Sequence, residues 1–144
     1  NSDACFGNIL YIKNNKPYRL WKAGKARSFI NGWMPPHPTL FIKKEIYDKY
    51  GYFSLDCGTA ADYELMLRFF EKRNISSTWL NEIFVNMSIG GASNATFLSR
   101  IKAHKKDKYA WKKNNLKYNN HTVWFKKLRK IPQFILAKFY KGEQ

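Results

Sequence analysis

Two carboxylates open the segment Ala60 to Lys72, which the sequence predicts as a helix. Asp62 and Glu64 stand two residues apart, so on a helix their side chains point roughly 200° away from each other and cannot face one substrate hydroxyl. A carboxylate here can accept a proton as a general base, and the positive helix end would keep it ionised. An Asp in the first helical turn can also be a structural cap. Spacing alone leaves both interpretations open for Asp62 and favours the cap.

A histidine between two prolines is the second candidate. His37 lies between Pro36 and Pro38, which restrict the backbone on both sides and so aim the imidazole in one direction. The ring could present a hydrogen-bonding group to a ligand, and Trp33 could stack on an apolar ligand face. The alternatives are a structural hydrogen bond for His37 and a core position for Trp33, and the residue types do not decide between them.

A small-residue segment covers residues 90–94, with the sequence Gly-Gly-Ala-Ser-Asn. Backbone amides in such a loop can wrap a phosphate. The segment lacks the spacing of a P-loop or of a dinucleotide-binding fingerprint. An ordinary turn before a helix is therefore the favoured interpretation of Gly90, Gly91 and Ser93.

Two motifs taken together suggest a family. Residues 32–41 read GWMPPHPTLF, and residues 61–68 follow about twenty positions later as ADYELMLR. The pair resembles the acceptor-side half of family 2 glycosyltransferases, which have the GT-A fold. The resemblance implies an α/β fold, a partial GT-A-like mixed sheet with flanking helices. It implies inverting transfer from a nucleotide-sugar donor to a glycan or lipid-linked acceptor, in bacterial surface polysaccharide synthesis.

The resemblance also assigns roles to the candidate residues. Asp62 matches the catalytic base of the family, although Ala61 replaces the acidic residue that commonly precedes it. Substrate contacts would come from Trp33, His37 and Glu64, with His37 hydrogen-bonding a sugar and Trp33 stacking on the apolar face of a pyranose ring. In the resembling enzymes, a loop near Gly90, Gly91 and Ser93 closes over the donor diphosphate.

The family uses a divalent cation, Mn²⁺ or Mg²⁺, held mainly by an Asp-x-Asp element that precedes the region matched here. This sequence contains no such element. The cation's main ligands are therefore expected outside these residues, together with the donor-binding half, and the isolated chain is expected to be inactive.

Composition limits the class of protein. The 144 residues are 44% hydrophobic and 17% aromatic, enough apolar surface for one folded domain. No run of about eighteen apolar residues and no secretory leader is present. The first residue is Asn1 and a strand is expected almost at once, which suggests a piece of a longer protein. Two thiols, Cys5 and Cys57, fit a reduced cytosolic protein better than a disulfide. The expected location is cytoplasmic, including the inner face of the membrane.

The expected elements alternate between strands and helices. A hairpin is predicted from Cys5–Ile12 and Tyr18–Lys22, around the turn-prone Asn14-Asn15-Lys16-Pro17. The next segments are a loop or short helix over 22–31, a strand over 39–42, a helix over 43–50 that ends at Gly51, the buried helix 60–72, and a strand, turn and strand over 76–89. Helices are predicted over 96–118 and 121–140, the second interrupted at Pro132.

Positive charge is concentrated at the C-terminal end. Residues 1–99 hold 12 Lys and Arg against 8 Asp and Glu, whereas residues 100–144 hold 14 against 2. We therefore divide the chain into an acceptor-side body, 1–99, and a basic, aromatic-rich helical tail, 100–144. Every third or fourth residue of the second tail helix is apolar, which suits the surface of an anionic membrane. Two alternatives remain open: this face packs on a missing half of the enzyme, or the basic segment is an ordinary solvated helical surface. The apolar positions are Phe125, Leu128, Ile131, Ile135 and Phe139.

Two alternatives to an enzyme remain. The net charge of +16 is typical of nucleic-acid-binding modules, but the sequence carries no RNA-recognition, zinc-finger or KH signature, which disfavours that class. The second alternative is a non-catalytic remnant that lacks its donor half. Such a remnant would contain the same residues as the enzyme, so the sequence does not separate the two. A chain that exposes the face meant for another half is also expected to self-associate.

Overall fold

The computed structural model describes residues 2–89 and 97–140. It is a mixed α/β structure with one four-stranded mixed sheet, so the predicted fold class is confirmed at this level. The strands are β1 (Ala4–Lys13), β2 (Lys16–Trp21), β3 (Phe41–Ile42) and β4 (Ser77–Ser88). The α-helices are α1 (Lys44–Tyr50), α2 (Ala61–Met66), α3 (Phe97–Lys113), α4 (Asn120–Leu128) and α5 (Ile131–Phe139). A π-helical segment, Leu67–Lys72, continues α2.

Strand β1 is the centre of the sheet. It pairs with β4 in parallel along one edge, and with β3 and then β2 in antiparallel fashion along the other. The predicted hairpin is confirmed, with Asn14 and Asn15 at φ values of 50° and 57°. Asparagine tolerates this left-handed conformation, so the two residues make a tight turn whose twist matches that of the strands.

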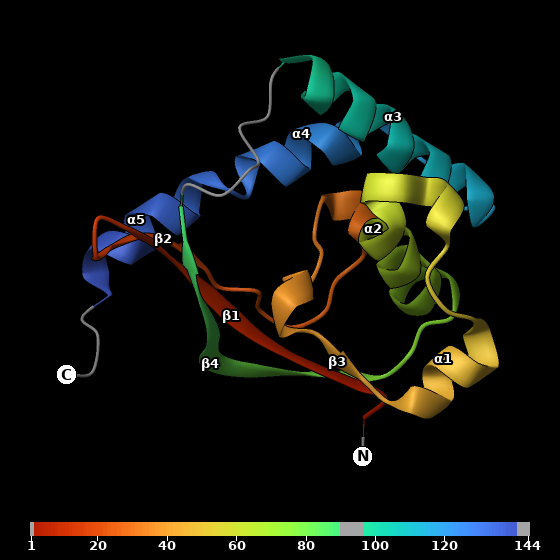
Figure 1. Cartoon of the computed structure of the whole chain (residues 1–144), viewed down its shortest axis with the longest axis horizontal. Coiled ribbons are helices and arrows are strands. Elements are labelled where there is room, and N and C mark those ends of the chain that lie inside the picture. The colour runs from red at the N-terminus through yellow and green to blue at the C-terminus, as the bar shows by residue number, and fades with distance from the viewer. Residues whose placement is uncertain (1, 90–96, 141–144) are drawn as a thin grey trace.

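Within residues 76–89 the structure has one continuous strand, β4 (Ser77–Ser88), so the prediction of a strand, turn and strand is wrong. Two steps along β1, from Phe6 to Asn8, face four steps along β4, from Trp79 to Ile83. The polar residues Asn81 and Glu82 therefore lie in a bulge rather than a reversal, and β4 bends there while it continues beside β1. Figure 1 shows this bend in the strand.

The core lies between the sheet and α2. Fully buried side chains from both meet there, and Phe6 packs against Phe70 with ring centroids 6.3 Å apart. Helix α1 ends where predicted, at Gly51, whose φ of 91° suits glycine and whose amide donates to the carbonyl of Tyr47. The predicted buried helix over 60–72 is confirmed as α2 and its π-helical continuation.

The three C-terminal helices return to the body. Helix α3 packs on α2 and on the 3-10 segment Leu55–Ala60, α4 packs on the short turn Phe29–Asn31, and α5 packs on β2. Figure 1 shows α3 running to the right above α2, after which the chain turns back through α4 and leads on to α5 beside β2. The predicted interruption near Pro132 is confirmed, because α4 ends at Leu128 and Pro132 stands in the first turn of α5. Within the described part of the chain, no helix has the length and hydropathy needed to cross a bilayer.

Candidate functional site

Asp62 stands in the first turn of α2 with its side chain exposed. The N-cap of this helix is Ala60, and no side chain makes the capping hydrogen bond. Among the described residues, nothing forms a hydrogen bond or an ion pair with the Asp62 carboxylate. The structural cap that the spacing favoured is therefore wrong, and the carboxylate is free to contact a ligand.

The residue after Asp62 is buried and tied to α3. The hydroxyl of Tyr63 accepts a hydrogen bond from the indole nitrogen of Trp111 at 2.9 Å. The ammonium of Lys126, from α4, lies 4.2 Å from the centre of the Tyr63 ring. Burial raises the pKa of the Tyr63 phenol. Tyr63 is thus a neutral anchor that holds the start of α2 from behind.

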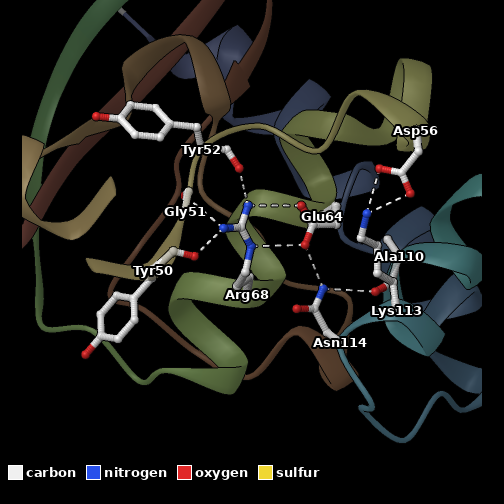
Figure 2. A network of polar contacts seen from close by, with 9 residues as sticks. All are labelled: Tyr50, Gly51, Tyr52, Asp56, Glu64, Arg68, Ala110, Lys113 and Asn114. Atoms are coloured by element: carbon white, nitrogen blue, oxygen red, sulfur yellow. Dashed lines mark hydrogen bonds and ion pairs between the residues drawn. The ribbon is translucent and has the colours of Figure 1, made fainter. Parts of the chain in front are cut away.

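Glu64 is buried in a polar network, shown in Figure 2. Its carboxylate pairs with the guanidinium of Arg68 at 3.1 Å and accepts a hydrogen bond from the amide of Asn114 at 3.1 Å. Arg68 also donates to the carbonyl oxygens of Gly51, at 2.8 Å, and Tyr52, at 2.6 Å. With 1% of its residue surface exposed, Glu64 has no room for the predicted substrate contact. It instead fixes α2 to α3 and to the loop after α1.

The segment before α2 is held by a second carboxylate. Asp56 accepts hydrogen bonds from the Lys113 ammonium at 2.6 Å and from the Tyr109 hydroxyl at 3.0 Å. These bonds hold the pKa of the Asp56 carboxyl below its usual range. Gly58, between Asp56 and α2, has a φ of 53°, which favours glycine at the kink that aims the helix. Asp62 therefore sits on a helix start that is fixed on both sides.

His37 is exposed, and its turn is anchored by the residue two positions later. The turn His37–Thr39 follows Pro36, and the fully buried Thr39 hydroxyl donates to the carbonyl of Pro36 at 2.8 Å. The amide of Gly7 in β1 donates to the same hydroxyl at 3.3 Å. No hydrogen bond joins His37 and Asp62 in the described part of the chain.

Trp33 is a core residue, so the structure does not support the predicted sugar-stacking contact. It is 4% exposed, and its indole nitrogen donates to the carbonyl of Ala23 at 2.9 Å. Its ring packs against Phe6, Phe29 and Phe70. Its apolar ring is buried inside the body, and its one polar group makes a hydrogen bond there.

Two further expectations concern the loop at the donor diphosphate and the divalent cation, whose main ligands are expected outside these residues. The loop with Gly90, Gly91 and Ser93 lies outside the described residues. Over residues 2–89 and 97–140, no three His, Cys, Asp or Glu side chains lie close enough together to hold a metal ion. Cavities of about 310 Å³ and 360 Å³ are lined by residues other than Asp62 and His37, and both of these side chains are exposed.

Sequence reasoning missed three residues that position the site. Arg68 and Asn114 complete the Glu64 network, and Thr39 anchors the histidine turn. The signal for Arg68 was its spacing, because Glu64 and Arg68 are four residues apart on one helix face. Nothing local indicated Asn114, since its partner is fifty residues away in the sequence.

Comparisons of this chain with protein families, with curated proteins and with solved structures found no match.

Proposed function

We propose that this chain is the acceptor-side half of an inverting glycosyltransferase with a GT-A-like fold, and that Asp62 is its catalytic base. The observation that carries the proposal is the contrast at the start of α2. Asp62 is exposed and unpaired among the described residues, while Tyr63 and Glu64 beside it are buried and bonded to α3. A free carboxylate on a rigid support is what general-base catalysis needs. The motifs around His37 and Asp62 supply the substrate class.

In the proposed reaction, Asp62 accepts the proton of an acceptor hydroxyl. The hydroxyl oxygen then forms a bond to the anomeric carbon of the donor sugar, and the bond from that carbon to the nucleotide diphosphate breaks on the opposite face. The configuration at the carbon inverts. His37, exposed on its anchored turn, is proposed to hydrogen-bond the acceptor sugar.

The family resembled uses Mn²⁺ or Mg²⁺ at the donor diphosphate. The described residues do not fit such an ion, because no cluster of three suitable ligands is present among them. We therefore assign no step to a cation in these residues. The proposed location is cytoplasmic, where the free thiols Cys5 and Cys57 would stay reduced.

The test is an NMR titration of the isotope-labelled chain with a panel of saccharides and, separately, with UDP, GDP and their sugars in the presence of Mn²⁺ or Mg²⁺. We expect a saccharide to shift the amide signals around Asp62 and His37, and Asp62→Asn to weaken that response without unfolding the chain. Nucleotides alone should have no effect. Saccharides that shift no signals near Asp62 would contradict an acceptor site, and saturable nucleotide binding would place donor recognition within these residues.

The remnant alternative is separated by activity. Hydrolysis or transfer of the donor sugar that disappears in Asp62→Asn would exclude a non-catalytic remnant. Asp62→Asn is suited to this because it removes the base while it keeps the size and exposure of the side chain.

A further inference from the structure

Helix α5 has an apolar face that points away from the protein. Its inner face is buried against β2 through Gln133 and Ala137. Three residues spaced four apart, Ile131, Ile135 and Phe139, occupy the opposite face and are 58%, 55% and 79% exposed. A helix at the surface of a globular protein normally shows the reverse arrangement, with its apolar face toward the core.

Large apolar side chains are also exposed on α4. Phe125 and Leu128 are 47% and 54% exposed at the end of α4 that leads into α5. We call the following set the outward face: Phe125, Leu128, Ile131, Ile135 and Phe139. Because monomeric proteins seldom leave large apolar surfaces uncovered, exposed apolar side chains on two successive helices favour a partner that covers them.

The charges around the outward face identify the chemistry of the partner. Residues 120–139 contain five Lys and Arg and no Asp or Glu. Two of the five are bonded to the body, because Lys126 pairs with Asp107 and Arg129 donates to the carbonyl of Asn31. Lys138, next to Phe139 in the sequence, is exposed, and so are Lys13 and Lys16 in the hairpin of β1 and β2, where β2 is the strand on which α5 packs. Exposed apolar side chains together with an excess of cations match a surface with apolar depth and anionic headgroups.

We propose that α4 and α5 form a docking surface for an anionic lipid bilayer, with the outward face in the interfacial layer and the lysines at the headgroups. The inference rests on exposure and charge and does not depend on the proposed glycosyl transfer. Two copies of the chain joined through this face would bring like charges together, which opposes association. A nucleic acid would satisfy the lysines but would leave the apolar side chains in water.

The test is co-sedimentation of the 144-residue chain with vesicles of phosphatidylcholine alone and of phosphatidylcholine with phosphatidylglycerol. We expect binding to the anionic vesicles only, weakened by salt. Ile135→Asp should lower the partition coefficient of the chain onto anionic vesicles by about tenfold or more, because it removes one aliphatic side chain that the bilayer would bury. Lys138→Gln should lower it by about fivefold.

Leu55→Asp is the matched control, because Leu55 is 87% exposed on a different element and the substitution changes the charge equally. It should retain more binding than Ile135→Asp, and circular dichroism should show that both variants are folded. The proposal is overturned by equal losses in the two variants, or by no binding to anionic vesicles. It is also overturned if Ile135→Asp leaves vesicle binding unchanged but dissociates a dimer in analytical ultracentrifugation, or if random RNA binds the chain and vesicles do not.

Discussion

Two helical regions of this chain differ in which side chains they bury and which they expose. Between α2 and α3, a carboxylate, a guanidinium and an amide are buried together, and their hydrogen bonds are satisfied. Along α4 and α5, isoleucine and phenylalanine side chains lie in the open. The first region offsets the cost of desolvating charge with well-formed hydrogen bonds and gains a fixed helix start. The second retains exposed apolar surface, which is explained if a further surface covers it.

The largest effect should come from breaking the buried network. Glu64→Ala leaves Arg68 with a largely buried guanidinium (13% of its side chain exposed) that has lost its carboxylate. We expect a loss of about 3–5 kcal/mol in the free energy of unfolding, measured by urea denaturation. Asp62→Ala, two residues away, should stay within about 0.5 kcal/mol of the parent. Equal losses in the two variants would mean that Asp62 is also structural.

The two faces of α5 can be compared directly. Ala137→Lys puts a cation against β2 at a position that is 3% exposed. We expect it to cost about 2 kcal/mol or more in unfolding free energy and to raise amide hydrogen exchange in α5. Ile135→Lys, on the outward face, should change neither quantity by much. A destabilising Ile135→Lys would show that the outward face is packed in the isolated chain.

The contact between α4 and the body depends on one glycine. A Cβ at Gly32 would lie 2.3 Å from the backbone nitrogen of Lys126, and the φ of Gly32 is 69°. Gly32→Ala should therefore lower stability by about 2 kcal/mol through the clash and the left-handed strain together. Gly24 has nearly the same φ, 68°, but a Cβ there would meet open space. Gly24→Ala therefore measures the backbone strain without the clash. A thermal melt should show the larger loss for Gly32→Ala.

The smallest effect concerns pH. The folded-state pKa of Asp56 is lowered by Lys113 and Tyr109, so its contribution to stability is present above the unfolded pKa, about 4, and is lost as pH falls through the lower folded value. Asp56→Asn should make the loss of stability below about pH 4 shallower. Urea midpoints at several pH values test this. Because Asp56 is exposed, added salt should reduce the difference between the two proteins, and an unchanged acid profile would contradict the assignment.

Local signals predicted the elements well where one residue type decides the backbone. The asparagine pair predicted the hairpin turn, Gly51 predicted the end of α1, and Pro132 predicted the break between α4 and α5. The bulge in β4 was misread because polar residues such as Asn81 and Glu82 interrupt an apolar pattern equally in a turn or a bulge. Only the pairing with β1 distinguishes the two.

The candidate site was predicted in part. The sequence indicated that Asp62 and Glu64 lie on different sides of one helix, and the structure confirms that one is exposed and the other buried. The prediction of a substrate contact for Glu64 was wrong because its partner Asn114, which directly follows α3, lies beyond the reach of local spacing. Trp33 was misplaced for a similar reason, since the type of an aromatic residue does not show which side of the chain meets the core.

The sequence by itself determined the turn at Asn14 and Asn15, the end of α1 at Gly51, the break before α5, the concentration of positive charge at residues 100–144 and the periodic apolar positions of α4 and α5. These follow from backbone preferences and from side-chain spacing, which act over a few residues. Tertiary structure alone decided which carboxylate is free, which is locked to Arg68 and Asn114, and that the apolar side of α5 faces outward. Those outcomes depend on which surfaces meet when segments distant in the sequence pack together. A side chain is buried or bonded only once its distant partner lies beside it.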